Sequence, residues 1–200
     1  MKKLIVLAAV LMAWIGRSQI IYQGNSLINA QVGFGLTNHV SMSNGAGMDF
    51  KLKTVIPPVG LSYEYAIKDN ITVGGFADYA VQQGIMKMTD PFNPGDEVKI
   101  TTDYNYIFLG ALANYHFNLN IDKVDVYGGI KLGYLAFSSQ TTSSGDSDLP
   151  ANLGTTDMSG LIYGFQLGGR YFFTDHLAAH LHLGYGVSYV SFGITYKLGY

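Results

Sequence analysis

The chain has no cysteine, few charged residues and a single tryptophan. Without cysteine it forms neither a disulfide scaffold nor a thiolate metal site, and it has no residue to acylate as a lipoprotein does. Charged residues are 13% of its 200 residues, against roughly 25% in a soluble globular domain. The formal net charge of −2 offers no basic surface, so we expect no nucleic-acid partner.

Apolar residues, glycine and aromatic residues are abundant instead. Hydrophobic residues make up 48% of the chain, which also carries 25 Gly, 15 Tyr and 11 Phe. Disordered chains are poor in apolar residues and rich in charge, so this composition excludes them. It favours one folded domain, built from strands that face an apolar solvent.

The N-terminus has the pattern of a secretory signal. A basic start is followed by an apolar run over residues 4–15, which is shorter than the ~20 residues of a transmembrane helix. Small residues at Gly16 and Ser18 then suit a cleavage site. We expect a signal peptide at residues 1–18 and one domain at residues 19–200, with a retained N-terminal anchor as the alternative. An exported chain of this composition is a secreted β protein or a barrel in an outer membrane.

Apolar residues alternate with polar or small ones along most of the chain. The alternation is cleanest at the C-terminus, where Phe192, Ile194, Tyr196, Leu198 and Tyr200 are separated by polar or small residues. A period of two predicts β-strands, and this many glycines disfavour helices. We expect eight strands, over residues 28–36, 59–67, 71–82, 107–117, 124–134, 161–173, 177–187 and 191–200.

The connections between these segments alternate between short and long. This pattern predicts an all-β fold, an eight-stranded antiparallel up-and-down transmembrane β-barrel with short periplasmic turns and longer extracellular loops. The last connection, near Ser188, is short. The expected turns are residues 68–70, 118–123 and 174–176, and the expected long loops are residues 37–54, 83–103 and 137–160.

Charge is confined to one face of the predicted strands. A soluble barrel would spread charges over its outer surface, so we assign the polar face to the lumen and the apolar face to lipid. An eight-stranded barrel is narrow enough for side chains to fill it, and unpaired charges inside would be costly. We therefore predict a salt-bridge network that fills the lumen, with a polar lining for a narrow ion path as the alternative. The network residues are Glu64, Asp78, Asp125, Lys131, Arg170 and Lys197.

Three segments carry a family resemblance: residues 57–65 (PPVGLSYEY), 171–176 (YFFTDH) and 195–200 (TYKLGY). With them, the chain resembles the small eight-stranded outer-membrane β-barrel proteins of double-membraned bacteria, which include OmpX and the OmpA barrel. The resemblance covers residues 27–200 and implies a place in the cell outer membrane. It also implies that Phe192, Ile194, Tyr196, Leu198 and Tyr200 form the signal read by the barrel-insertion machinery, although the usual last residue is Phe. We expect no peptidoglycan-binding domain.

Two histidines are the most conspicuous candidates for site chemistry. His180 and His182 point the same way on one predicted strand, as two metal ligands could. No acid accompanies them there, and strand pairing across residues 174–176 sets Arg170 opposite His180, which disfavours a metal. We expect hydrogen-bonding roles in the lumen, and neither a metal site nor a cofactor.

Catalysis has weaker support. Outer-membrane lipid-modifying enzymes use a Ser/His/acid set on the same architecture, but Ser188 at the loop rim has no evident partner in the sequence. We expect no catalytic residues and a monomeric structural or interaction protein, with the extracellular loops as contact surface. The alternatives are a narrow porin-like channel for small solutes and a lipid-modifying enzyme. Outer-membrane lipid and lipopolysaccharide are the expected surroundings, and Asp146, Asp148 and Asp157 make one loop acidic.

Overall fold

The computed structural model describes residues 20–35, 39–44, 48–89, 97–119, 121–144, 151–185 and 188–199. The predicted signal peptide and Tyr200 lie outside the described residues. No helix in the described part of the chain is long and apolar enough to cross a membrane. The strands are β1 (Ser26–Phe34), β2 (His39–Asn44), β3 (Met48–Lys68), β4 (Ile71–Thr89), β5 (Glu97–Phe117), β6 (Val124–Ser144), β7 (Asn152–Phe172), β8 (Leu177–Tyr185) and β9 (Val190–Leu198).

Eight of these strands form a closed antiparallel ring. Each of β3 to β9 pairs with its neighbour in the chain, and β1 closes the ring by pairing with both β9 and β3. At the closure Ile28 lies opposite Tyr196 on one side and Tyr63 on the other. The eight-stranded up-and-down barrel is confirmed, and so is the predicted pairing of Arg170 with His180. The ninth strand, β2, pairs with β3 outside the ring.

The predicted division of the strands into two faces is also confirmed. Leu132 and Leu181, from the apolar face, are 59% and 51% exposed on the outside of the barrel. Gln166, from the polar face, is 9% exposed inside it. The inner face at these levels is rich in glycine, as a crowded lumen requires. At Gly193 an added Cβ would lie 1.9 Å from the backbone oxygen of Ala30 on the neighbouring strand.

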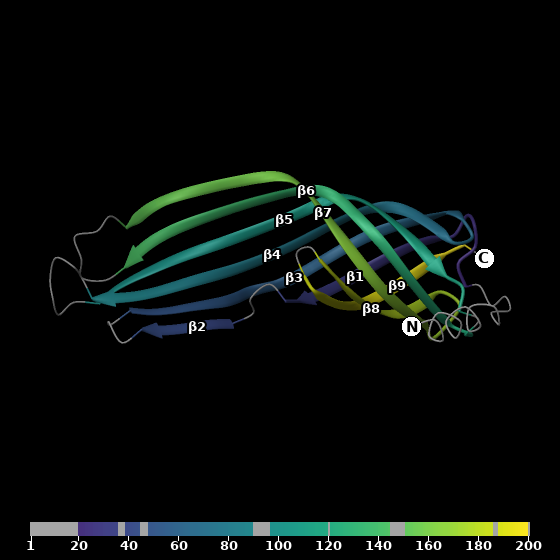
Figure 1. The fold of residues 1–200 in the computed structure, drawn as a ribbon, viewed down its shortest axis with the longest axis horizontal. Helices are drawn as coiled ribbons and strands as arrows, with labels where there is room; N and C mark the ends of the chain where they lie inside the picture. Colours follow the sequence, from purple (N-terminus) through teal and green to yellow (C-terminus); the bar gives the residue numbers. More distant parts are fainter. Residues whose placement is uncertain are drawn as a thin grey trace, which may run out of the picture.

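The segments expected as long loops are largely strand. β3, β5, β6 and β7 each have 21 residues and β4 has 19, whereas β1, β8 and β9 have nine each. Nine residues suit one membrane crossing of ~9–11 residues. The longer strands run well beyond β1, β8 and β9, and Figure 1 shows them continuing together as a sheet. Pairs such as Thr89–Glu97 and Lys99–Ser144 hold this region together far from the ring.

We call this region the outer sheet: β2 with residues 48–56, 82–89, 97–106, 135–144 and 152–162 of β3 to β7. Its two faces have the opposite polarity to those of the ring. Tyr104 and Phe137, in phase with the lumen side chains, stack at 6.1 Å, and an added Cβ on Gly84 would lie 3.2 Å from Tyr104 and 3.6 Å from Phe50. The opposite face carries exposed Lys53, Lys87, Lys99 and Gln140. Outside the membrane the outer face of the sheet contacts water, so the polar side chains lie on that face.

An apolar layer separates the lumen from the outer sheet. Phe76, Ala80, Phe108 and Leu112 are buried together, and the Phe76 and Phe108 rings meet edge to face at 4.6 Å. The partly buried side chains packed against this layer come from the adjoining part of the outer sheet. They are Tyr106, Leu135 and Ile162.

Candidate functional site

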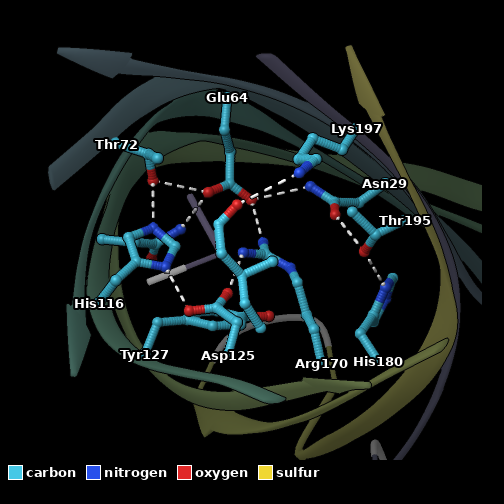
Figure 2. Close-up of polar contacts among 12 residues, drawn as sticks. Asn29, Glu64, Thr72, His116, Asp125, Tyr127, Arg170, His180, Thr195 and Lys197 are labelled. Carbon is cyan, nitrogen blue, oxygen red and sulfur yellow. Dashed lines mark hydrogen bonds and ion pairs between the residues drawn. The ribbon is translucent and has the colours of Figure 1, made fainter. Parts of the chain in front are cut away.

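A buried charge cluster occupies the lumen of the ring. Arg170 on β7 donates to two carboxylates from different strands: Nη2 to Oε1 of Glu64 on β3 at 2.5 Å, and Nη1 to Oδ2 of Asp125 on β6 at 3.0 Å. All three side chains are almost completely buried. Figure 2 shows the guanidinium between the two acids, with the wall of the barrel around them.

The Glu64 carboxylate accepts a full set of hydrogen bonds. Besides Arg170, Asn29 donates to Oε1 at 2.8 Å, while Thr72 and Asn114 donate to Oε2 at 2.7 and 2.8 Å. Gln166 in turn donates to the Asn114 side chain at 2.5 Å. A buried ionised carboxylate is tolerated when its lone pairs are satisfied in this way.

His116 connects two other members of the cluster. The one proton of the Thr72 hydroxyl goes to Glu64, so the Thr72 oxygen accepts from His116 Nε2, 3.0 Å away. His116 Nδ1 lies 2.8 Å from Oδ1 of Asp125, an acceptor. His116 therefore bridges Thr72, which donates to Glu64, and Asp125. The sequence analysis missed His116, although it shares the phase of Phe108 and Leu112 in a segment whose alternation is imperfect.

Aromatic and imidazole rings extend the cluster toward β8 and β9. The Arg170 guanidinium lies over the Tyr127 ring, 4.0 Å from its centroid, and the Tyr127 hydroxyl contacts His182 Nε2. The His180 and His182 rings stack at 4.6 Å. Thr195 donates to Asn29 at 2.7 Å, so His180 Nδ1, 2.9 Å from the Thr195 hydroxyl, donates to it. Both histidines thus lie within hydrogen-bonded groups, and the described residues contain no cluster of three or more metal-ligating side chains.

A second ion pair lies nearer the outer mouth of the ring. Lys131 Nζ is 3.5 Å from Oδ2 of Asp78, and Gln31 donates to the other carboxylate oxygen at 3.1 Å. The Lys131 ammonium also lies 4.7 Å from the centroid of the Phe76 ring. The hollow beside this pair measures about 30 Å³, room for about one water molecule.

Lys197 lies apart from both groups. It donates to the backbone oxygen of Ile20 at 3.3 Å and lies 5.7 Å from the Phe172 ring. The structure therefore brings five of the six predicted lumen charges into ion pairs, in two separate groups, and places Lys197 beside the turn at residues 173–176.

The other predicted residues are placed as follows. The Ser188 hydroxyl forms a hydrogen bond with the Ser191 hydroxyl, and their oxygen atoms are 2.6 Å apart. Four residues of the expected assembly signal lie on the outer face of β9, the strand that closes the ring against β1. They are Phe192, Ile194, Tyr196 and Leu198.

The sequence matches the family model of the outer membrane protein β-barrel domain over residues 18–191. The chain belongs to this family. The protein is therefore an integral β-barrel of the outer membrane, and its short turns face the periplasm as in other such barrels. No curated protein matches the chain.

Solved structures similar to this chain are outer-membrane barrels of low sequence identity. The N-terminal barrel domain of Pseudomonas aeruginosa OprF covers 88% of this chain and 98% of its own, with 15% identity and a TM-score of 0.48. Ail, the attachment invasion locus protein of Yersinia pestis, solved with the heparin analogue sucrose octasulfate, covers 88% and 99%, with 14% identity and a TM-score of 0.49. OprG of Pseudomonas aeruginosa covers 90% and 98%, with 17% identity and a TM-score of 0.47.

Proposed function

We propose that the protein is a closed outer-membrane anchor that presents the outer sheet to molecules outside the cell. The observation that carries this proposal is the difference in strand length between β3–β7 and the nine-residue β1, β8 and β9. At ~3.3 Å per residue, about ten additional residues raise the sheet by roughly 30 Å along the strands. A paired sheet of that height is a rigid contact surface in place of the long loops that the sequence suggested.

The contents of the lumen support a closed barrel over a porin-like channel. The Arg170 cluster fills one part of the lumen, and the Phe76–Phe108 layer fills another together with the Asp78–Lys131 pair, whose ammonium lies on the Phe76 ring. The hollow of about 30 Å³ beside that pair is too small for a solute path. The Ser188 hydroxyl contacts Ser191, and His180 and His182 contact Thr195 and Tyr127, so no hydrogen bond between a serine and a histidine is seen at these described positions, which supports a non-enzymatic role.

Two measurements test the proposal together. In planar bilayers the protein should show no steady conductance, and large single-channel currents would support the porin alternative. Because the chain has no cysteine, single cysteines report exposure on intact cells. A membrane-impermeant maleimide should label Gln140→Cys in the outer sheet, whereas Asn118→Cys in a periplasmic turn should react only after lysis. Equal labelling of both on intact cells would refute the orientation.

Biogenesis follows from the same architecture. We propose that residues 1–18 direct export and that the β9 residues are read by the barrel-insertion machinery. We also propose that the protein functions as a monomer among outer-membrane lipid and lipopolysaccharide. Both edges of the sheet disappear when β9 pairs with β1, so deletion of residues 198–200 should leave a protease-sensitive periplasmic chain. Normal membrane yield of this truncation would contradict the assembly role.

A further inference from the structure

We propose that the inner face of the outer sheet holds a binding cleft for an uncharged apolar small molecule, taken from the medium outside the cell. This inference rests on the proposed function, because it needs the outer sheet to stand outside the membrane. It goes further by naming the ligand class and the residues that contact it.

The cleft lies along β5, β6 and β7, just beyond the apolar layer that closes the lumen. Its volume is about 650 Å³, within the ~300–1,000 Å³ range of small-molecule sites. The Tyr106 and Phe137 rings meet at 5.1 Å in its wall, and the side chains that pack on the apolar layer form its floor. The residues that line it are Tyr106, Leu135, Phe137, Met158 and Ile162, with Asp157 at its lip.

One lining residue is conspicuously unprotected. Met158, opposite Phe137 on the neighbouring strand, is 64% exposed although it belongs to the apolar face of the outer sheet. Burying an apolar side chain of this size is favourable because it removes apolar surface from water. A ligand that covers Met158 and the adjacent rings would therefore gain from surface that the folded chain leaves in water.

The cleft opens to the side, at an edge of the sheet. Pairing between β7 and β8 begins at Phe165–Tyr185, so in the described structure residues 152–164 of β7 pair with β6 alone. This gap lies beyond the outer end of the nine-residue β8 strand, mostly in the part of β7 that belongs to the outer sheet. A ligand in the surrounding medium can therefore reach the cleft without crossing the bilayer or the filled lumen.

The charge of the lining restricts which apolar ligands fit. Asp157 lies at the lip on the exposed edge of β7, but its side chain alternates with that of Met158 and points to the water-facing side. The lining supplies aromatic and aliphatic contact without a cationic side chain to hold a carboxylate or phosphate. The chemistry therefore favours an uncharged molecule with an aliphatic or aromatic body over a fatty acid or an anionic lipid.

Tryptophan quenching tests the site directly. Trp14 is the only tryptophan of the chain and lies in the predicted signal peptide, so Phe137→Trp places a single reporter in the cleft. With the protein in lipid nanodiscs, a brominated dodecanol should quench this tryptophan saturably. The matched control is Gln140→Trp on the water-facing side of the same strand, which should show only weak, non-saturating quenching. If Phe137→Trp fails to fold, Met158→Trp at an exposed position serves as the reporter.

The charge argument has its own test. Brominated dodecanoate should bind about two- to fivefold more weakly than the alcohol, because its carboxylate leaves water and finds no cationic side chain in the lining. Met158→Glu, which places a carboxylate on the apolar face, should weaken quenching by both ligands. Equal quenching of the two reporters, or a preference for the carboxylate, would overturn the proposal.

Two further outcomes are distinguishable. In nanodiscs made with acyl-brominated phospholipid, quenching of Phe137→Trp without added alcohol would mean that a membrane lipid fills the cleft, which contradicts a ligand from the medium. Absence of any quenching, with Gln140→Cys still labelled on intact cells, would refute the cleft and leave the anchor function standing.

Discussion

Replacing Arg170 with methionine should strongly destabilise the barrel. The guanidinium is completely buried and donates to Glu64 and Asp125 at 2.5 and 3.0 Å. Without it, two buried carboxylates lose the guanidinium that pairs with both of them. Removing one partner of a buried ion pair costs about 3–5 kcal/mol when the site is dry. The free energy of unfolding, measured by urea titration in lipid vesicles with the folded band on unboiled gels as readout, should fall by about that amount.

Two companion variants separate charge from packing. Arg170→Lys keeps the charge but cannot donate in a fixed fork to both acids, so about 1–3 kcal/mol should be lost. Adding Glu64→Gln to Arg170→Met removes one of the two carboxylates left without the guanidinium, and the double variant should recover at least about 1 kcal/mol of the loss. A loss below about 1 kcal/mol for Arg170→Met, with no recovery in the double variant, would mean that water screens the cluster and that the lumen is not closed there.

Three further predictions concern lipid, packing and the second ion pair. Leu132→Arg on the lipid face should lower the free energy of unfolding by about 2–4 kcal/mol. Gln140→Arg, farther along the same strand in the outer sheet, should change it by less than about 0.5 kcal/mol. Equal effects of the two substitutions would contradict the assigned membrane level. Gly193→Ala places a Cβ 1.9 Å from a backbone oxygen of β1 and should lower the free energy of unfolding by at least about 1–3 kcal/mol. Gly160→Ala should fold normally, because an added Cβ there has no atom within 4 Å. Lys131→Ala should lower the free energy of unfolding by about 1–3 kcal/mol, which is less than the loss for Arg170→Met. The Lys131–Asp78 contact is 3.5 Å long, and Asp78 still accepts a hydrogen bond from Gln31. Equal losses for the two variants would refute that ranking.

The membrane-spanning part of the fold could be predicted from the sequence by itself. In lipid, each strand must turn apolar side chains outward at every second residue, so residue parity alone separates Leu132 and Leu181 from Gln166. The short turn after β7 likewise set the register that places Arg170 opposite His180. The alternation of side chains and the length of a short turn are local constraints, because they depend only on neighbouring residues and on the surrounding solvent.

Only the tertiary structure decided which charges meet and how far the strands extend. Glu64 and Arg170 are 106 residues apart, on β3 and β7, and closure of the ring brings them together with His116, whose polar role depends on Thr72 and Asp125 from other strands. The outer sheet escaped sequence analysis because its polarity is reversed: Lys53 and Gln140 face outward while Phe137 faces inward. Outside the membrane water surrounds the strand, so the alternate residues that face lipid in the ring face water in the outer sheet and are polar. In sequence such a strand looks like a polar loop, and only its pairing with neighbouring strands distinguishes the two.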